Sequence, residues 1–508
     1  MKKVLVTAGA MLLWTGLAHG ASTDMVRMPA DDYRAIMKQL DALQNKVDQL
    51  DKRPAASSAQ APAAARRPAS AAPAGSGDAR LDRLEDDINN IYDTLDQVET
   101  KTVKDRINFG AEYRLRYDTY MYENLSIMHL GTGVPITEDR VSEDDHNNWT
   151  NRFRINMAAN ISRSLRFHGR LALLHAWGDH DENQIVNFYN EANAAQRPGN
   201  NDLRVDRFYI DWIPQGPIPL AITVGRHPSS EGPPLEFKEN RQRQSTYPAL
   251  LFDGQNDGIV VTLGLERYLR LKKSGLRLGY GKIYHSDMND SNWSFLDDSA
   301  TDDGNLAAAF FETQVPGLKN SLLVLSFAHV QDMPASFTEY GYYNLGNEDF
   351  MSGHFQWGDI GGSGLDIFAS YTTNKTDPND TAMVGMPGLL SDGGANIESQ
   401  TGWGFFTGLR FTIPVEAMNN PRIGFEYNHG SEFHCAMTGG SNELYNKLAT
   451  RGSAYEVYWI QPASRNLFFR AGYTYIEYEY SGSGMPVGLP QPINTEFHNP
   501  YLLMDVRF

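Results

Sequence analysis

The chain has 508 residues, of which 41% are hydrophobic, and its formal net charge is −17. No stretch beyond the N-terminal residues comes close to the ~20 consecutive apolar residues that a membrane-spanning helix needs, so a helical membrane protein is excluded. The acidic balance argues against a nucleic-acid partner, because phosphate contacts need clustered Lys and Arg in a net basic domain.

The N-terminal part of the chain divides into four segments. Residues 1–20 combine a basic start, an apolar run and small residues at the usual cleavage positions, which predicts a secretory signal peptide. Residues 21–52 and 79–104 have heptad spacing and flank an Ala/Pro-rich linker, residues 53–78. Each heptad run is shorter than a secure coiled coil, so a lone amphipathic helix packed on the rest of the protein is an alternative. We expect an oligomeric coiled-coil stalk.

Residues 105–508 show the period-2 alternation of strands with one apolar and one polar face. In the first segment, Ile107 and Phe109 share one face, while Glu112 and Arg114 lie on the other. In a soluble sandwich the apolar face is buried, whereas in a membrane barrel it faces lipid and the charged face lines water. The segments of this kind lie near residues 106–118, 152–161, 165–177, 203–212, 220–226, 258–266, 276–284, 306–315, 321–330, 354–358, 364–372, 402–411, 422–429, 454–460, 467–480 and 501–508.

Connection lengths between these segments alternate along the chain. The first gaps are long (119–148), short (162–164), long (178–202) and short (213–219). Up-and-down outer-membrane barrels have short periplasmic turns and long external loops, whereas a sandwich has no reason for this asymmetry. The final strand ends in Phe508, which is typical of the assembly signal of such barrels. The sequence predicts an all-β fold, a 16-stranded antiparallel transmembrane β-barrel preceded by a short helical coiled-coil stalk in the periplasm.

Several motifs between residues 104 and 285 resemble a known family. They are Asn151-Arg152-Phe153-Arg154, Gly169-Arg170-Leu171 through Trp177-Gly178-Asp179, Leu203-Arg204-Val205-Asp206-Arg207, Val224-Gly225-Arg226, Gly232-Pro233-Pro234, Glu239-Asn240-Arg241 and Pro248 to Gly254. These motifs are similar to those of outer-membrane porins of unknown function that are common in sulfate- and metal-reducing bacteria. The resemblance implies a barrel fold and an outer-membrane location, and it implies no particular solute.

The charged residues of three neighbouring strands and of the third long loop (226–257) are candidates for a pore lining. In sixteen-stranded porins this loop folds into the barrel, and charges of both signs held there would decide which ions pass. A solvated external loop is the alternative for this segment, and ion-paired wall struts are the alternative for the arginines. The candidate pore-lining and constriction residues are Arg114, Arg116, Arg152, Arg154, Arg166, Arg170, Arg226, Glu231, Glu236, Lys238, Glu239, Arg241, Arg243 and Asp253.

Metal, cofactor and catalytic motifs are weak or missing in this sequence. His429, Glu432 and His434 lie beside Cys435, the one cysteine, but their spacing is not that of a zinc site. A lone cysteine permits no internal disulfide and no CxxC metal pair. No hydrolase, Walker-type or dinucleotide glycine motif occurs, and nothing pairs a nucleophile with a base. We therefore expect no cofactor, no metal and no enzymatic activity.

These observations favour an outer-membrane porin that lets small hydrophilic solutes and ions diffuse through a water-filled barrel. The arginine-rich strand faces predict a weak preference for anions. We expect a homotrimer in contact with outer-membrane lipid and lipopolysaccharide. A structural envelope tether, a barrel sheath around an electron-transfer partner and, less favoured, an outer-membrane enzyme are the alternatives.

Overall fold

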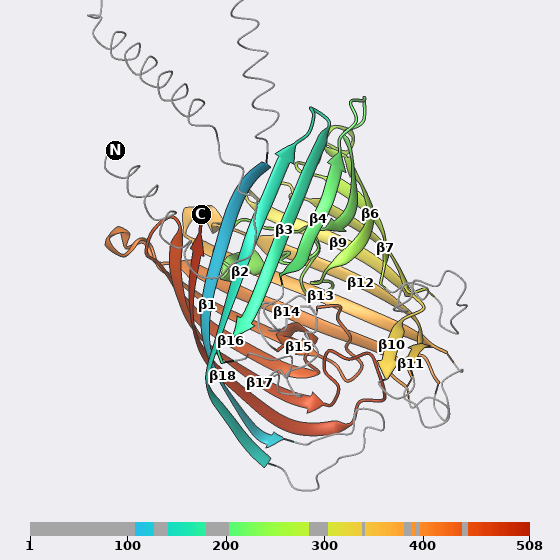
Figure 1. Cartoon of the computed structure of the whole chain (residues 1–508), viewed down its shortest axis with the longest axis vertical. Helices are drawn as coiled ribbons and strands as arrows, with labels where there is room; N and C mark the ends of the chain where they lie inside the picture. The colour runs from blue at the N-terminus through green and yellow to red at the C-terminus, as the bar shows by residue number, and fades with distance from the viewer. Residues whose placement is uncertain are drawn as a thin grey trace, which may run out of the picture. The chain divides into compact units, whose positions relative to one another are not determined.

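The computed structural model describes residues 107–125, 141–178, 203–283, 303–337, 341–379, 388–391, 397–438 and 445–508. The predicted signal peptide, both heptad segments and the linker lie outside these residues. Sixteen antiparallel strands close into one barrel, in which β1 pairs with β2 on one side and with β18 on the other (Figure 1). The prediction of an all-β, 16-stranded antiparallel barrel is therefore confirmed.

Each predicted strand segment overlaps one barrel strand. The strands are β1 (Ile107–Leu125), β2 (Val141–Asn160), β3 (Leu165–Ala176), β4 (Arg204–Trp212), β5 (Leu220–His227), β6 (Asn256–Gly264), β7 (Gly275–Lys282), β8 (Asn305–Thr313), β9 (Ser321–Gln331), β12 (Gly346–Trp357), β13 (Leu365–Pro378), β14 (Thr401–Thr412), β15 (Arg422–Gly430), β16 (Gly452–Pro462), β17 (Leu467–Tyr480) and β18 (Pro492–Arg507). A separate hairpin, β10 (Pro334–Phe337) and β11 (Gly341–Asn344), was not predicted. The helical turns are α4 (Leu235–Lys238), α5 (Glu266–Leu269), η2 (Ile360–Gly362), η3 (Glu416–Met418) and η4 (Lys447–Ala449).

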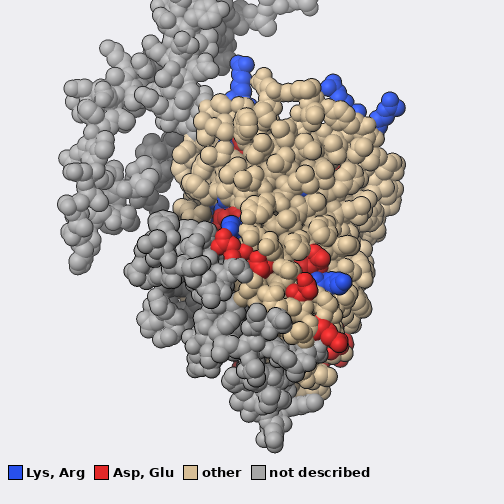
Figure 2. Space-filling view, turned by 90° about the vertical axis from the view of Figure 1, so that its right-hand side faces the viewer, with Lys and Arg blue, Asp and Glu red and all other residues tan. Residues whose placement is uncertain are grey.

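The outer face of the barrel is apolar, because alternate residues of each strand point outward. Phe109, Phe208 and Leu502 are 69%, 56% and 58% exposed. A broad band of the surface is almost free of charged residues, and Lys and Arg gather at its upper rim (Figure 2). Such a band of exposed apolar side chains suits contact with lipid rather than water.

The strands β1, β2, β12 and β18 are longer than predicted at one end of the barrel. The segment 119–148, predicted as a loop, contains the end of β1 and the start of β2. Here the inner face includes buried aromatic side chains: Tyr120 and Tyr122 are both 2% exposed and pack on Phe497. Large apolar side chains thus occur on the inner face as well, which is why the hydropathy pattern does not mark these extensions.

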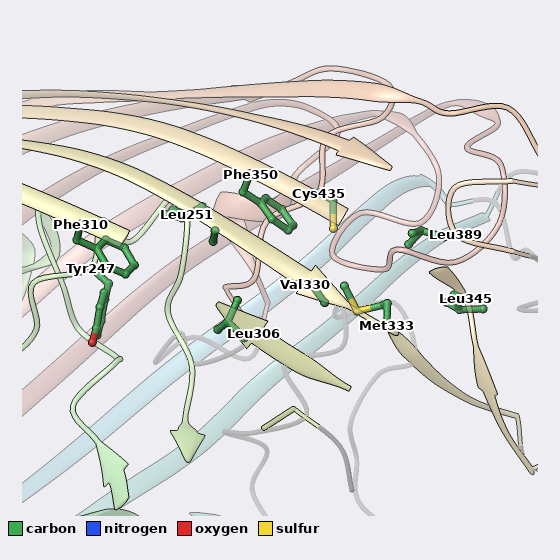
Figure 3. Packing of buried hydrophobic residues seen from close by; sticks show 11 residues of the cluster. Tyr247, Leu251, Leu306, Phe310, Val330, Met333, Leu345, Phe350, Leu389 and Cys435 are labelled. Carbon is green, nitrogen blue, oxygen red and sulfur yellow. The ribbon is translucent and has the colours of Figure 1, made fainter. Parts of the chain in front are cut away.

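Connections at one end of the barrel are short turns, such as residues 161–164 and 463–466, and those at the other end are long. The third long connection, residues 228–255, joins β5 to β6 and is called the infolded loop below. Tyr247 and Leu251 of this loop belong to a buried cluster with Phe310 and Phe350 of the wall (Figure 3). This cluster fixes one side of the loop to the inner face of the β8–β12 wall.

Candidate functional site

Glu231 of the infolded loop is the centre of a buried ion-pair network. Its carboxylate accepts hydrogen bonds from Arg154 at 2.7 Å, Arg241 at 2.9 Å and Arg170 at 3.1 Å. The network also includes longer contacts to Arg152 at 3.8 Å and Arg207 at 3.6 Å. Glu231 is only 2% exposed, so these guanidiniums take the place of water around the carboxylate. We call this set of residues the Glu231 network.

A second carboxylate and a loop aspartate complete the Glu231 network. Glu112 of β1 accepts a hydrogen bond from Arg241 at 2.8 Å and lies 3.8 Å from Arg154. Asp253, near the other end of the loop, accepts a hydrogen bond from the backbone N–H of Glu231 at 2.7 Å. The loop is therefore tied both to the strand wall and to itself.

A β-bulge in β4 supplies two more members of this site. Arg170 of β3 pairs with Arg207 and the next residue of β3 pairs with Val205, so Asp206 is the extra residue. A bulge re-aims a side chain, and here both Asp206 and Arg207 are buried on the inner face. Asp206 forms an ion pair with Arg170, and Arg207 donates to the backbone oxygen of Ser230 at 3.1 Å. Sequence reasoning missed both residues, although two adjacent charges in an alternating strand signal a bulge.

The α4 end of the infolded loop binds the wall formed by β1, β17 and β18. Glu239 forms an ion pair with Arg114 and another, at 3.2 Å, with Arg470. Arg114 also pairs with Asp505 at 2.7 Å. Since Glu231 binds β2 and β3 while Glu239 binds β1 and β17, the loop lies inside the barrel, where α4 is seen in green in Figure 1. The alternative of a solvated external loop is therefore not what the structure contains.

A third contact joins the infolded loop to another inward segment, residues 445–451. Glu426 and Glu456 face each other across β15 and β16, which would be repulsive without counter-charges. Lys447 lies 2.6 Å from both carboxylates, and Lys238 of α4 lies 3.1 Å from Glu456. We call these four residues the Lys–Glu square. It connects two long loops through charges on the strand wall.

Burial and charge set the protonation of the loop carboxylates in opposite directions. Burial alone would raise the pKa of Glu231, but Arg154 and Arg241 outweigh it and hold that pKa well below its usual range. The same balance, with Arg114 as the main opposing charge, lowers the pKa of Glu239. Burial raises the pKa of Glu236, because its main partner is the neutral amide of Gln356 at 2.7 Å. The arginines thus favour the anionic form of Glu231 and Glu239, whereas burial disfavours the anionic form of Glu236.

The predicted arginine wall is largely neutralised by these carboxylates. Arg114, Arg152, Arg154 and Arg170 are at most 4% exposed and belong to the ion pairs described above. Arg116, likewise 4% exposed, pairs with Asp118 at 2.7 Å on its own strand. The alternative of ion-paired wall struts therefore describes these five arginines.

Two predicted pore-lining residues, Arg226 and Arg166, lie outside the Glu231 network. Arg226 shares the outer face of β5 with Val224, which is 48% exposed, and pairs with Asp257 at 2.7 Å. Placing Arg226 in the lumen was wrong, because the side chains of a strand alternate and the lumen-facing neighbour is His227. Arg166 is exposed at the start of β3, beside the short turn, and is not part of the Glu231 network.

The described part of the chain includes two arginine-lined cavities between the infolded loop and the wall of β1–β8. One has a volume of about 470 Å³ and is lined by Arg170, Arg207 and Arg243, among others. The second, of about 200 Å³, is lined by Arg243 and Arg277. Arg243 and Arg277 both pair with Glu312 at 3.1 Å. Both cavities are thus bordered by cationic groups.

No metal-binding cluster occurs within the part of the chain that the structure describes. His429 packs on Trp403 on the outer face of β15, whereas His434 is buried and contacts the backbone oxygen of Leu448 at 3.0 Å. The two histidines therefore do not share a site. Among the same described residues, no helix is long and apolar enough to cross a membrane.

The chain end closes the barrel through backbone hydrogen bonds. The N–H of Phe508 donates to the oxygen of Ala111 at 2.9 Å, and the N–H of Ala111 donates to the oxygen of Phe508 at 2.6 Å. The Phe508 ring is on the surface, with 71% of the residue exposed. Phe508 thus contributes both to the ladder and to the apolar outer face.

Residues 142–506 match a family model described as protein of unknown function (DUF3373). The chain belongs to this family. The match includes the motifs from which the family resemblance was inferred. No curated protein matches the chain.

Several solved outer-membrane proteins are similar to this family member. OprB of Pseudomonas putida has 14% identity and a TM-score of 0.46, over 81% of this chain and 96% of that chain. OmpF of Salmonella typhi has 10% identity and a TM-score of 0.43, over 79% and 97%. The trimer form of OmpT from Vibrio cholerae has 11% identity and a TM-score of 0.38, over 78% and 99%. These identities are too low to indicate a solute.

Proposed function

We propose that this protein is an outer-membrane porin through which small hydrophilic solutes and ions diffuse passively. The observation that carries the proposal is the infolded loop, which crosses the barrel interior: Glu231 binds Arg154 of β2, and Glu236 binds Gln356 of β12 on the opposite side of the barrel. A loop anchored in this way narrows the lumen permanently, and no conformational change is needed for the narrowing. Polar cavities beside it, rather than an apolar plug, are what a route for hydrophilic solutes requires.

The proposed route runs along the wall of β1–β8, where the two cavities lie. On the other side, α4 and residues 445–451 fill the space with buried side chains such as Phe237 and Leu448, which belong to one buried cluster with Phe406 of β14. The infolded loop thus narrows the lumen from one side. A narrow, off-centre route of this kind would give a small conductance.

We propose a weak preference for anions, now assigned to the arginines that line the cavities. The buried arginines of the wall are matched by carboxylates and exert little net field on solute. Arg207, Arg243 and Arg277 border the cavities, and Glu312 is the acidic partner of the last two.

Planar-bilayer recording on the purified full-length protein tests the proposal. We expect steady single-channel steps and a reversal potential in a KCl gradient that indicates anions. A barrel that is folded and inserted but does not conduct would overturn the porin assignment. A clear cation preference would overturn the assignment of the field to the cavity arginines.

The assembly proposed from the sequence is a homotrimer with lipid and lipopolysaccharide around it. In this arrangement residues 1–20 are the signal peptide, the short-turn end faces the periplasm, and the heptad segments form a periplasmic coiled-coil stalk. Detergent-extracted protein should run as a heat-labile trimer, and deletion of residues 21–103 should weaken this trimer without preventing insertion. A persistent monomer in mild detergent would contradict it.

A structural role is the second candidate, favoured by the extent to which the interior is filled. The Lys–Glu square and the Glu231 network together make the barrel interior a buried ionic lattice. A tether through the stalk or a sheath around an electron-transfer partner would use such rigidity without conduction. Folded protein without channels, together with cell-wall attachment or a co-purifying cytochrome, would favour this role, and hydrolysis of lipid or peptide would favour an outer-membrane enzyme.

A further inference from the structure

The larger cavity, of about 470 Å³, lies between the inner face of β1–β4 and the descending part of the infolded loop. Its volume is in the range of small-molecule sites, about 300–1,000 Å³. The polar and charged residues that line it are Asn108, Asn156, His168, Arg170, Arg207, Tyr209, Arg243 and Gln244. This lining contains arginines and no Asp or Glu among the residues that the structure describes.

Two of these arginines have donor atoms that other groups leave unused. The Nε atom of Arg207 and the Nη1 atom of Arg243 are buried without a hydrogen-bond partner. The Arg207 side chain is only 10% exposed, so water reaches it mainly through the cavity. Both atoms are closed off from solvent, but the Arg207 and Arg243 side chains border the cavity, where a bound anion would offset their positive charge.

The carboxylates that pair with the lining arginines do not themselves line the cavity. Asp206 and Glu231 bind Arg170 from the side of the ion-pair network, and neither lines the cavity. Glu312 binds Arg243 and Arg277 together, so one carboxylate faces two guanidiniums. The cavity surface formed by the described residues therefore presents guanidinium groups and no carboxylate, and Asp211 lies 3.5 Å from the lining residue His168.

An aromatic pair forms another part of the cavity wall. The rings of His168 and Tyr209 stack at 5.0 Å with an interplanar angle of 17°. This surface can cover the carbon skeleton of a bound molecule, while the guanidinium forks bind oxyanion groups. An inorganic ion would use only the second of these two features.

We propose that this cavity is a binding site for small organic anions that carry carboxylate groups. The inference gives the solute class of the proposed porin and rests on that function for transport, although binding itself needs only the folded barrel. Arg243 and Gln244 line both cavities, so an anion that moves from the larger cavity to the smaller one passes Arg243. Arg243 would thus contact the anion both in the binding site and on its way to the smaller cavity.

Calorimetric titration of the full-length protein in detergent with succinate tests the site. Its neutral analogue succinamide and inorganic phosphate serve as comparison ligands. We expect succinate to bind measurably, succinamide not to bind, and phosphate to bind more weakly than succinate. Equal binding of succinate and succinamide, or binding of phosphate alone, overturns the proposal.

Two glutamine variants separate a local charge from damage to the fold. Gln244→Glu adds a carboxylate to the cavity with almost no change of shape and should weaken succinate binding at least about tenfold. Gln242→Glu adds the same charge to an exposed residue of the same loop that does not line the cavity, and should leave binding nearly unchanged. Equal effects of the two variants contradict the site.

The failure of this inference differs from the failure of the proposed function. Channels without succinate binding would leave the porin in place and remove the site. Succinate binding in a protein that does not conduct would keep the site and remove the porin. In conducting protein, Arg243→Ser should lower succinate affinity and shift the reversal potential toward cations, whereas Arg163→Ser, in an exposed short turn, should change neither.

Discussion

Replacing Glu231 by Gln should release the infolded loop from the wall while leaving the barrel closed. The substitution keeps the shape of the side chain and removes the charge that several guanidiniums share. Strand pairing of the barrel does not involve this residue, since residue 231 lies in the connection between β5 and β6. The effect should therefore be local to the loop.

The size of the effect follows from the contacts of Glu231. Hydrogen bonds from guanidinium groups at 2.7, 2.9 and 3.1 Å become neutral ones. A hydrogen bond to a charged group contributes about 1.5–3 kcal/mol and a neutral one about 0.5–1.5, so three such changes cost about 3–5 kcal/mol. Removal of one partner from a buried ion pair gives the same range, about 3–5 kcal/mol. The two estimates of the free-energy cost agree because both describe the same situation: buried guanidinium groups that have lost their carboxylate partner.

Hydrogen exchange of the peptides that cover residues 228–255 measures the release of the loop. At about 1.4 kcal/mol per tenfold, the loss of protection should be at least about 100-fold. Glu236→Gln is the matched control in the same loop, because Gln356 can still donate to the new amide oxygen. Unchanged exchange in the Glu231 variant, or an equal change in the control, would refute the reasoning.

Three further predictions follow from the same contacts. Since the pKa of Glu231 is held well below its usual range, loop protection should persist as pH falls below about 4 and vanish only as pH passes the lowered pKa; loss by pH 5 contradicts this. Lys447→Met should destabilise the protein to denaturant by about 3–5 kcal/mol through the Lys–Glu square, while Lys375→Met, at an exposed site, should cost little. Deletion of Phe508, which removes its backbone hydrogen bonds to Ala111, should sharply lower outer-membrane levels on immunoblots, and normal levels would count against this role.

The strands could be predicted because the lipid imposes a simple rule on the outer face. Wherever apolar residues must alternate with polar ones, as in Ile107 to Tyr117, the period-2 pattern indicates both the strand and its inner side. The rule fails beyond the lipid-facing band, where the buried aromatic side chains of Tyr120 and Tyr122 lie on the inner face. It also fails for the β10–β11 hairpin, which lies outside the barrel ladder.

The charges of the site could be predicted in part, but their partners could not. The infolded loop was identified from its position and its mixed charges, and Glu231 and Glu239 do bind strand arginines. Asp505 and Lys447 join the same lattice from distant parts of the chain. Nothing local in the sequence marks them, because their pairing depends on the tertiary path of the loops. The sequence therefore left open whether the arginines line a pore or form ion-paired struts, and the structure contains ion pairs.

The net charge of the chain says little about the field inside the barrel. The formal charge of −17 includes every residue of the protein, whereas an ion in a cavity interacts mainly with groups within a Debye length of about 8 Å. The carboxylates of the Glu231 network form ion pairs with the wall arginines. The charged groups that line the cavities are guanidinium groups, of which Arg243 and Arg277 pair with Glu312. An acidic protein can thus have a cationic route. The selectivity should follow Arg207 and Arg243, because charges at the cavity surface act on a passing solute more strongly than charges enclosed in the wall.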